Sequence, residues 1–126
     1  MNVSNSVGIG RSAVKTGTIN SGESSIGDPL NLGREYNFLV IRIPDCSNVA
    51  DSSALRLSIG DTNNDSMCQF TDRNSGNEDI VDLPTSGSFR YILPILGVRR
   101  VTVITSVVTD GDVAIEVFGV EPVIGV

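Results

Sequence analysis

Apolar and polar residues alternate along most of this chain with the two-residue period of a β-strand. The alternation is clearest over residues 54–59 (ALRLSI), where aliphatic side chains share one face and polar side chains share the other. Turn-forming Gly, Asn, Asp, Ser and Pro residues separate such segments, and no segment combines a helical period with helix caps. Strands are predicted at residues 12–19, 36–43, 54–59, 67–71, 78–83, 89–93, 99–106 and 113–120.

The densest apolar stretch reads YNFLVIRI and ends before a proline. In a strand, Leu39, Ile41 and Ile43 would point together into a core. Phe38 and Val40 would point the other way, so we expect them to meet a second surface. This stretch therefore predicts a strand with two apolar faces near the centre of the fold.

The number and spacing of these segments are typical of a β-sandwich of about eight antiparallel strands, and we expect an all-β, jelly-roll-like fold. A chain of 126 residues is long enough for one domain with one core. We assign residues 1–22 to an extended N-terminal arm, rich in Ser, Asn and Gly, which ends in a first edge strand. Residues 23–126 form the β-sandwich domain.

Charge divides the chain at the same place. Arg11 and Lys15 give the arm a net charge of +2, whereas the remainder carries all fifteen acids and a net charge of −8. An acidic body repels phosphate backbones, so nucleic acid is not expected as the main partner. The basic arm suits docking on an acidic protein surface or is a solvated tail.

Histidine is absent from the sequence. Without it the chain has no Ser-His-Asp or Cys-His catalytic group and no histidine metal ligand. We therefore expect a non-enzymatic protein that needs no cofactor and no metal. The two cysteines, Cys46 and Cys68, are expected to be buried free thiols, although their positions near predicted strands allow a bridge.

The N-terminus lacks the apolar core of a signal peptide, and the longest apolar run, Phe38–Ile41, is too short to span a membrane. A soluble protein is therefore expected, synthesised outside the secretory route. A chain with a single lysine has few charges to protect the edges of an open sandwich. Covering those edges with a neighbouring subunit favours a homo-oligomer.

Three motifs have chemical interpretations that we weigh against structural ones. Residues 61–65 (DTNND) match the start of a calcium loop, but Ser66 stands where a glycine belongs, so a hairpin turn is favoured. Residues 8–13 (GIGRSA) match a dinucleotide fingerprint but lack the following helix that the fingerprint needs. The paired acids Asp110/Asp112 and Glu78/Asp79 resemble an acid–base pair, but solvated turn residues are the favoured interpretation.

Arginine and tyrosine are enriched in protein interfaces, because they combine a large contact area with directional hydrogen bonds. On that basis, and because of the basic arm, the candidate interface residues are Arg11, Lys15, Arg90, Tyr91, Arg99 and Arg100.

Between Thr18 and Glu121 the sequence resembles the small β-sandwich proteins of tailed-phage virions. The shared order of parts is a polar lead-in (TINSGESSIGDPLNLG), a strand closed by proline (FLVIRIP), an alternating strand with an acidic turn (LRLSIGDTNND), an aromatic strand (CQFTDRNSG), and the strands FRYILP, RRVTVITS and VAIEVFGV. The resemblance implies a non-enzymatic capsid decoration or cement protein on the virion surface. It also implies binding to the major capsid protein or another virion protein, and trimers that clamp neighbouring capsid subunits.

An alternative from another class is a carbohydrate- or receptor-binding module of a phage tail or fibre. The same sandwich folds serve both purposes, so the fold alone does not separate them. The absence of tryptophan counts against the carbohydrate alternative.

Overall fold

Eight β-strands make up the computed structural model, which describes residues 7–60, 67–71 and 76–124. Within these ranges the chain forms no helix. The all-β architecture predicted from the alternating pattern is therefore confirmed. The strands are β1 (Val7–Arg11), β2 (Lys15–Ile19), β3 (Leu30–Ile43), β4 (Ala54–Gly60), β5 (Cys68–Gln69), β6 (Val81–Asp82), β7 (Phe89–Thr105) and β8 (Val113–Ile124).

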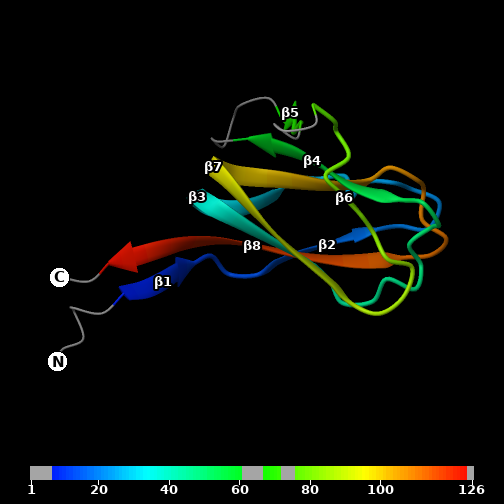
Figure 1. The fold of residues 1–126 in the computed structure, drawn as a ribbon, viewed down its shortest axis with the longest axis horizontal. Helices are drawn as coiled ribbons and strands as arrows, with labels where there is room; N and C mark the ends of the chain where they lie inside the picture. Colours follow the sequence, from blue (N-terminus) through cyan, green and yellow to red (C-terminus); the bar gives the residue numbers. More distant parts are fainter. Residues whose placement is uncertain (1–6, 61–66, 72–75, 125–126) are drawn as a thin grey trace.

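Hydrogen bonds join all eight strands into one open antiparallel sheet in the order β1-β8-β3-β7-β4-β5. Strand β2 also pairs with β8, next to β1, and β6 pairs with β4 beside β5. Figure 1 shows β1 and β8 side by side, with the start of β1 close to the end of β8. The long strands β3, β7 and β8 form the centre of the sheet.

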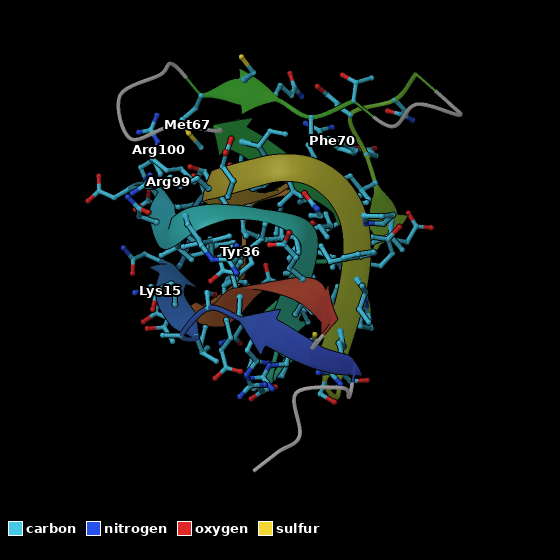
Figure 2. The ribbon with its side chains drawn as sticks, turned by 90° about the vertical axis from the view of Figure 1, so that its left-hand side faces the viewer. Lys15, Tyr36, Met67, Phe70, Arg99 and Arg100 are labelled. Atoms are coloured by element: carbon cyan, nitrogen blue, oxygen red, sulfur yellow. The ribbon has the colours of Figure 1, made fainter. Side chains whose placement is uncertain are left out.

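Strand β7 is the element that folds the sheet over its core. It pairs with β3 from Phe89 to Val101, and its last part, from Arg100 to Thr105, pairs with β4. Gly97, with a φ of 74° that a side chain would make costly, lies just before the part that pairs with β4. Figure 2 shows β7 curving around the molecule, so that the two halves of the sheet face one another.

The core lies between these halves. Leu39, Ile41 and Ile43 of β3 are each 0% exposed, which confirms the inward face predicted for this strand. Each fully buried aliphatic side chain contributes about 1.5–3 kcal/mol relative to an exposed one. The other core residues with no exposed surface are Ile19, Cys46, Leu55, Leu57, Val101, Val103, Val113, Ile115 and Val117.

The structure corrects several predicted boundaries. The segments predicted as separate strands at 89–93 and 99–106 are parts of the single strand β7, which continues through Pro94. The segments at 67–71 and 78–83 contain strands of only two residues each. Cys68, expected to be buried, is exposed, whereas Cys46 is buried, and both are free thiols.

Much of the segment assigned to the N-terminal arm belongs to the sheet. Strand β2 is the edge strand expected within 12–19, and its Ile19 is 0% exposed. Strand β1 was not predicted from the sequence, and it pairs with β8 over five residue pairs. Ser12 fixes the connection between β1 and β2, because its hydroxyl accepts a hydrogen bond from the Gly119 amide (2.9 Å).

Candidate functional site

The outer face of the sheet, opposite the core, carries three rows of side chains across β7, β3 and β8. Phe38 and Val40 lie in the first two rows and point away from the core, on the opposite face from Leu39, Ile41 and Ile43. In register order the rows are Pro94–Phe38–Val120, Ile92–Val40–Phe118 and Arg90–Arg42–Glu116. Two rows are apolar and the third is charged.

A shallow groove of about 420 Å³ follows the apolar rows, and we call it the outer-face groove. Within it Ile92 is 57% exposed, the largest exposed fraction among the described large hydrophobic residues. Exposed apolar surface of this kind often marks a binding site. The residues that line the groove are Arg11, Phe38, Val40, Arg90, Ile92, Phe118 and Val120.

Two arginines cover the aromatic ring in this groove. The Cζ atoms of Arg11 and Arg42 lie 5.3 Å and 5.2 Å from the centroid of the Phe118 ring. Both distances fall within the range of cation–π attraction, which is worth about 0.5–1 kcal/mol at exposed sites. Phe118 is consequently only 3% exposed, although it lies on the outer face.

The charged row is incompletely neutralised. The Nε atom of Arg42 lies 3.1 Å from Oε1 of Glu116, an ion-pair distance without the alignment of a hydrogen bond. Arg90 stands opposite Arg42 on the other side and has no acidic partner in the described part of the chain. Like charges directly opposite on neighbouring strands repel one another. The row therefore carries two positive charges and one negative charge.

Arg90 also borders a second hollow of about 300 Å³ at the end of the outer-face groove. Arg42 and Glu116 line this hollow too, so the charged row separates the two depressions. Arg90 is the residue that both depressions share. A ligand that follows the outer face from one hollow to the other would therefore pass directly over its guanidinium.

The structure brings two of the six candidate interface residues together. Arg11 and Arg90 are 79 positions apart in the sequence, yet they line the same groove. Tyr91 faces the core side, where its ring stacks on Phe89 at a centroid distance of 6.3 Å. Lys15 lies opposite Val117, a residue of the buried face, and so outside the groove.

Arg99 and Arg100 lie in the middle of β7 and do not line the groove. Figure 2 shows both beside Met67. Five groove residues were not proposed as interface residues from the sequence, namely Phe38, Val40, Ile92, Phe118 and Val120. The alternating pattern places each of them on the outer face, but only the structure shows that they meet across three strands.

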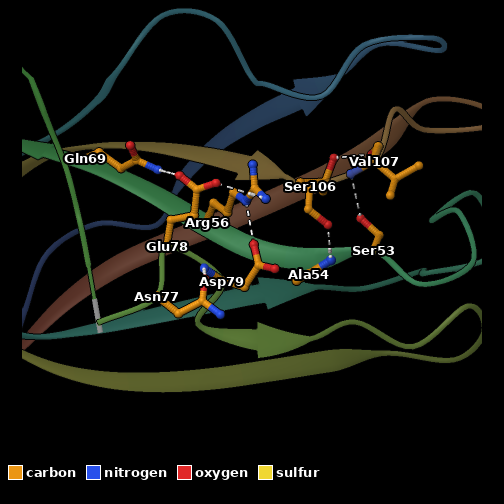
Figure 3. A network of polar contacts seen from close by, with 10 residues as sticks. Ser53, Ala54, Arg56, Gln69, Asn77, Glu78, Asp79, Ser106 and Val107 are labelled. Carbon is orange, nitrogen blue, oxygen red and sulfur yellow. Dashed lines mark hydrogen bonds and ion pairs between the residues drawn. The ribbon is translucent and has the colours of Figure 1, made fainter. Parts of the chain in front are cut away.

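The paired acids that resembled a catalytic pair have structural partners. Nη2 of Arg56 lies 3.1 Å from Glu78 Oε1, and its Nε donates a hydrogen bond to Asp79 Oδ1 at 2.5 Å. Gln69 donates a further bond to Glu78 (Figure 3). The hydrogen bond to Asp79 raises the pKa of Arg56, so this cluster is an ion-pair network between β4 and the segment before β6.

Asp112, from the other acidic pair, also has a structural partner. Asp112 accepts a hydrogen bond from the Ser21 amide (2.9 Å) and joins a turn to the start of β8. Among the described residues, no three of Cys, Asp and Glu are grouped so that they could hold a metal ion. The calcium-like segment 61–65 lies outside the described residues. The fingerprint-like segment 8–13 begins in β1 and is followed by β2 instead of a helix.

In the described part of the chain, no helix is long and apolar enough to cross a membrane. No protein-family model matches the sequence, and no curated protein matches it significantly. Among solved structures, the chain is similar to the SPBc2 prophage-derived protein YomS, with a TM-score of 0.52 and 16% identity over 90% of this chain and 95% of that one.

A second structure, the IMPa metallopeptidase in complex with T-antigen, aligns with 95% of this chain and 14% of its own, at 18% identity and a TM-score of 0.37. That likeness is too weak to bear on the fold or the site. The similarity to YomS covers nearly the whole of both chains, but at this identity it establishes the fold alone. The chain is thus an all-β antiparallel sheet protein with the fold of a prophage-derived protein.

Proposed function

We propose that this chain is a non-enzymatic structural protein of a phage virion, of the capsid decoration or cement type. In this proposal it attaches to the major capsid shell, or to another virion protein, through the outer-face groove. The fold shared with a prophage-derived protein supports a phage origin. The sequence resemblance to virion β-sandwich proteins supports the structural role.

The observation that carries the proposal is the exposure of Ile92 beside two arginines, Arg11 and Arg90, that have no acidic partner in the described part of the chain. Ile92 and Arg90 stand on β7 and Arg11 stands on β1, and the sheet holds these strands in fixed positions. Interfaces combine an apolar centre with arginine and aromatic side chains in this way. Such a surface binds without any chemical step.

A cement protein stabilises a shell because it binds the assembled lattice and not the separate subunits. Attachment through an oligomer increases avidity without requiring a strong individual contact. We therefore include a homo-oligomer, with a trimer favoured, in the proposal. Sedimentation of the purified chain measures the number of subunits, and a strictly monomeric chain contradicts this element.

The carbohydrate-binding alternative has less support on this face. Sugar rings stack on exposed aromatic faces, but the Phe118 ring is covered by Arg11 and Arg42. Tyr91 lies on the core-facing side of β7, and its side chain packs against the core. Neither ring offers an open platform.

The test is co-sedimentation of the purified chain with capsids of its phage, combined with detection of the chain in purified particles. Ile92→Ser should reduce attachment, because it removes the exposed apolar centre of the groove. Val108→Ser is the matched control, since Val108 is 52% exposed but lies outside the groove. Absence of the chain from purified particles would overturn the proposal. Equal loss of attachment in both variants would exclude this face.

A further inference from the structure

We infer that the outer-face groove binds an acidic peptide segment with an apolar residue between its carboxylates, contributed by the partner protein. The inference rests on the proposed function, because it names the chemistry of the partner at the same site. Three features of the face lead to it: the charges around the groove, the repulsion between Arg42 and Arg90, and the distribution of apolar surface.

The charges around the groove are the first argument. The lining contains two arginines and no acid, in a protein whose net charge is −6. Residues 1–6, which precede β1, also contain no acidic residue. A positive site on an acidic protein attracts a carboxylate locally while the rest of the surface repels other anions.

The repulsion between Arg42 and Arg90 is the second argument. Glu116 neutralises Arg42 from one side, so the charge left over in the row is that of Arg90. A carboxylate bound at Arg90 would give the row equal numbers of positive and negative charges. Arginine offers paired N–H donors in a planar fork that matches the two oxygens of a carboxylate.

The distribution of apolar surface is the third argument. Ile92 and Val40 are neighbours in one row, and Ile92 is exposed. Along the groove, Arg90 lies on one side of this row and Arg11 lies on the other. An apolar side chain of the partner would cover Ile92 while flanking carboxylates reach the two arginines. An extended segment in which an aspartate, an apolar residue and a second aspartate occupy every second position has this spacing, because the side chains on one face of a strand repeat every second residue.

Binding of short synthetic peptides tests the inference directly. The probe is a labelled nonapeptide with the central sequence Asp-Ser-Leu-Ser-Asp, which places both carboxylates and the leucine on one face when extended, and fluorescence anisotropy at low salt measures its affinity. Controls replace aspartate by asparagine, or leucine by serine. We expect each control peptide to bind at least about tenfold more weakly, the loss typical of a charge-assisted hydrogen bond or a buried aliphatic group. Binding of the asparagine peptide as tightly as the aspartate peptide overturns the inference, as does failure of all peptides to bind.

Variants of the protein locate the binding site. Arg90→Gln and Arg11→Gln should each weaken binding of the aspartate peptide by about tenfold or more and reduce its dependence on salt. Lys15→Gln changes the net charge equally but lies outside the groove, so its affinity should stay unchanged. If Arg90→Gln and Lys15→Gln weakened peptide binding equally, the change in affinity would reflect net charge alone and would contradict the inference. Circular dichroism of each variant shows whether a loss of binding is caused by unfolding. If Arg90→Gln is unfolded, Arg90→Lys is used in its place, because lysine keeps the positive charge but lacks the planar fork of donors.

The inference and the proposed function fail in different ways. A chain that binds the aspartate peptide through Arg90 but is missing from particles leaves the inference standing and overturns the virion role. If the chain is present on particles, and the Arg90→Gln variant attaches to them equally well, the inference is overturned and the virion role stands. Self-association that is lost in Arg90→Gln would assign the groove to a second copy of the chain and also overturn it.

Discussion

The ring of Tyr36 lies directly on the backbone of Gly119, so closely that a Cβ atom at the glycine would stand 2.4 Å from Tyr36 Cγ. Tyr36 is 5% exposed and belongs to the core cluster. The contact occurs where β3 pairs with β8, since Leu39 is opposite Gly119 in the register. A glycine in a strand interior often marks such a close approach of a neighbouring group.

Gly119→Ala should therefore destabilise the fold. The added methyl group overlaps the base of the Tyr36 side chain, which cannot move away by rotating about its outer bonds. Overpacking of this kind costs about 1–3 kcal/mol. The free energy of unfolding in urea measures the loss. Ala114→Ser, an exposed position on the same strand, is the control and should stay within about 0.5 kcal/mol of the parent protein. A Gly119→Ala variant as stable as this control would contradict the contact.

The two cysteines should react very differently with a thiol reagent. Cys46 is 0% exposed, and burial, with a smaller contribution from the charge of Asp45, raises the pKa of its thiol. Cys68 is exposed. Because only the thiolate reacts, one thiol per chain should react rapidly in the native protein, and two should react in the unfolded protein. Two fast equivalents from the native protein would show that Cys46 is accessible, and Cys68→Ser is the variant that identifies which thiol reacts.

Asp45 should contribute a pH-dependent increment of stability. Its Oδ1 accepts a hydrogen bond from the Ser47 amide at 2.9 Å, and this bond lowers the pKa of the carboxyl below its ordinary value of 3.8. A lowered pKa means that the increment is fully present above the unfolded pKa and is lost as the pH falls through the folded pKa. Unfolding free energies of the parent and of Asp45→Asn should therefore differ at neutral pH and converge in acid. A difference that stays constant with pH would contradict this assignment.

The Arg56 network should stabilise the edge formed by β4 and β6 in a salt-dependent manner. Arg56→Met keeps the aliphatic part of the side chain but removes both ion pairs, with Glu78 and Asp79. We expect a modestly lower urea midpoint, and a difference that shrinks at high salt because these groups are partly exposed and screened. Arg34→Met removes a single, more exposed pair with Glu121 and should have the smaller effect.

The strands that were predicted well are those whose pattern reports burial directly. Residues 54–59 alternate strictly, and β4 occupies them and one residue more. Proline and glycine were interpreted as strand ends, which divided β7 into two. Pro94 is compatible with an extended backbone, and Gly97 lets the strand bend without ending. Strand β1 has only two large apolar residues, Val7 and Ile9, separated by glycines, and this short pattern was not interpreted as a strand; its pairing is with β8.

The candidate site was only partly predictable for a related reason. Residue type alone selected Arg11 and Arg90, but their proximity depends on β1 pairing with β8, and on β3 lying between β8 and β7. Those pairings join distant parts of the chain and leave no local pattern. Alternation does separate Arg90 from Tyr91, because consecutive strand residues point to opposite faces. Tyr91 accordingly packs on the core side.

The pairing of β1 with β8 also determines how the protein responds to mechanical force. The strands are antiparallel, and Val7 is opposite Ile124, so the start of β1 and the end of β8 lie at the same point of the sheet. A force that pulls the two ends apart loads the Val7–Ile124 pair first and then each following pair in turn. The bonds would open one after another, as in a zipper, and not all at once as in strands sheared lengthwise. Low force applied at its ends should therefore peel β1 from the edge while the bent sheet and its core stay intact.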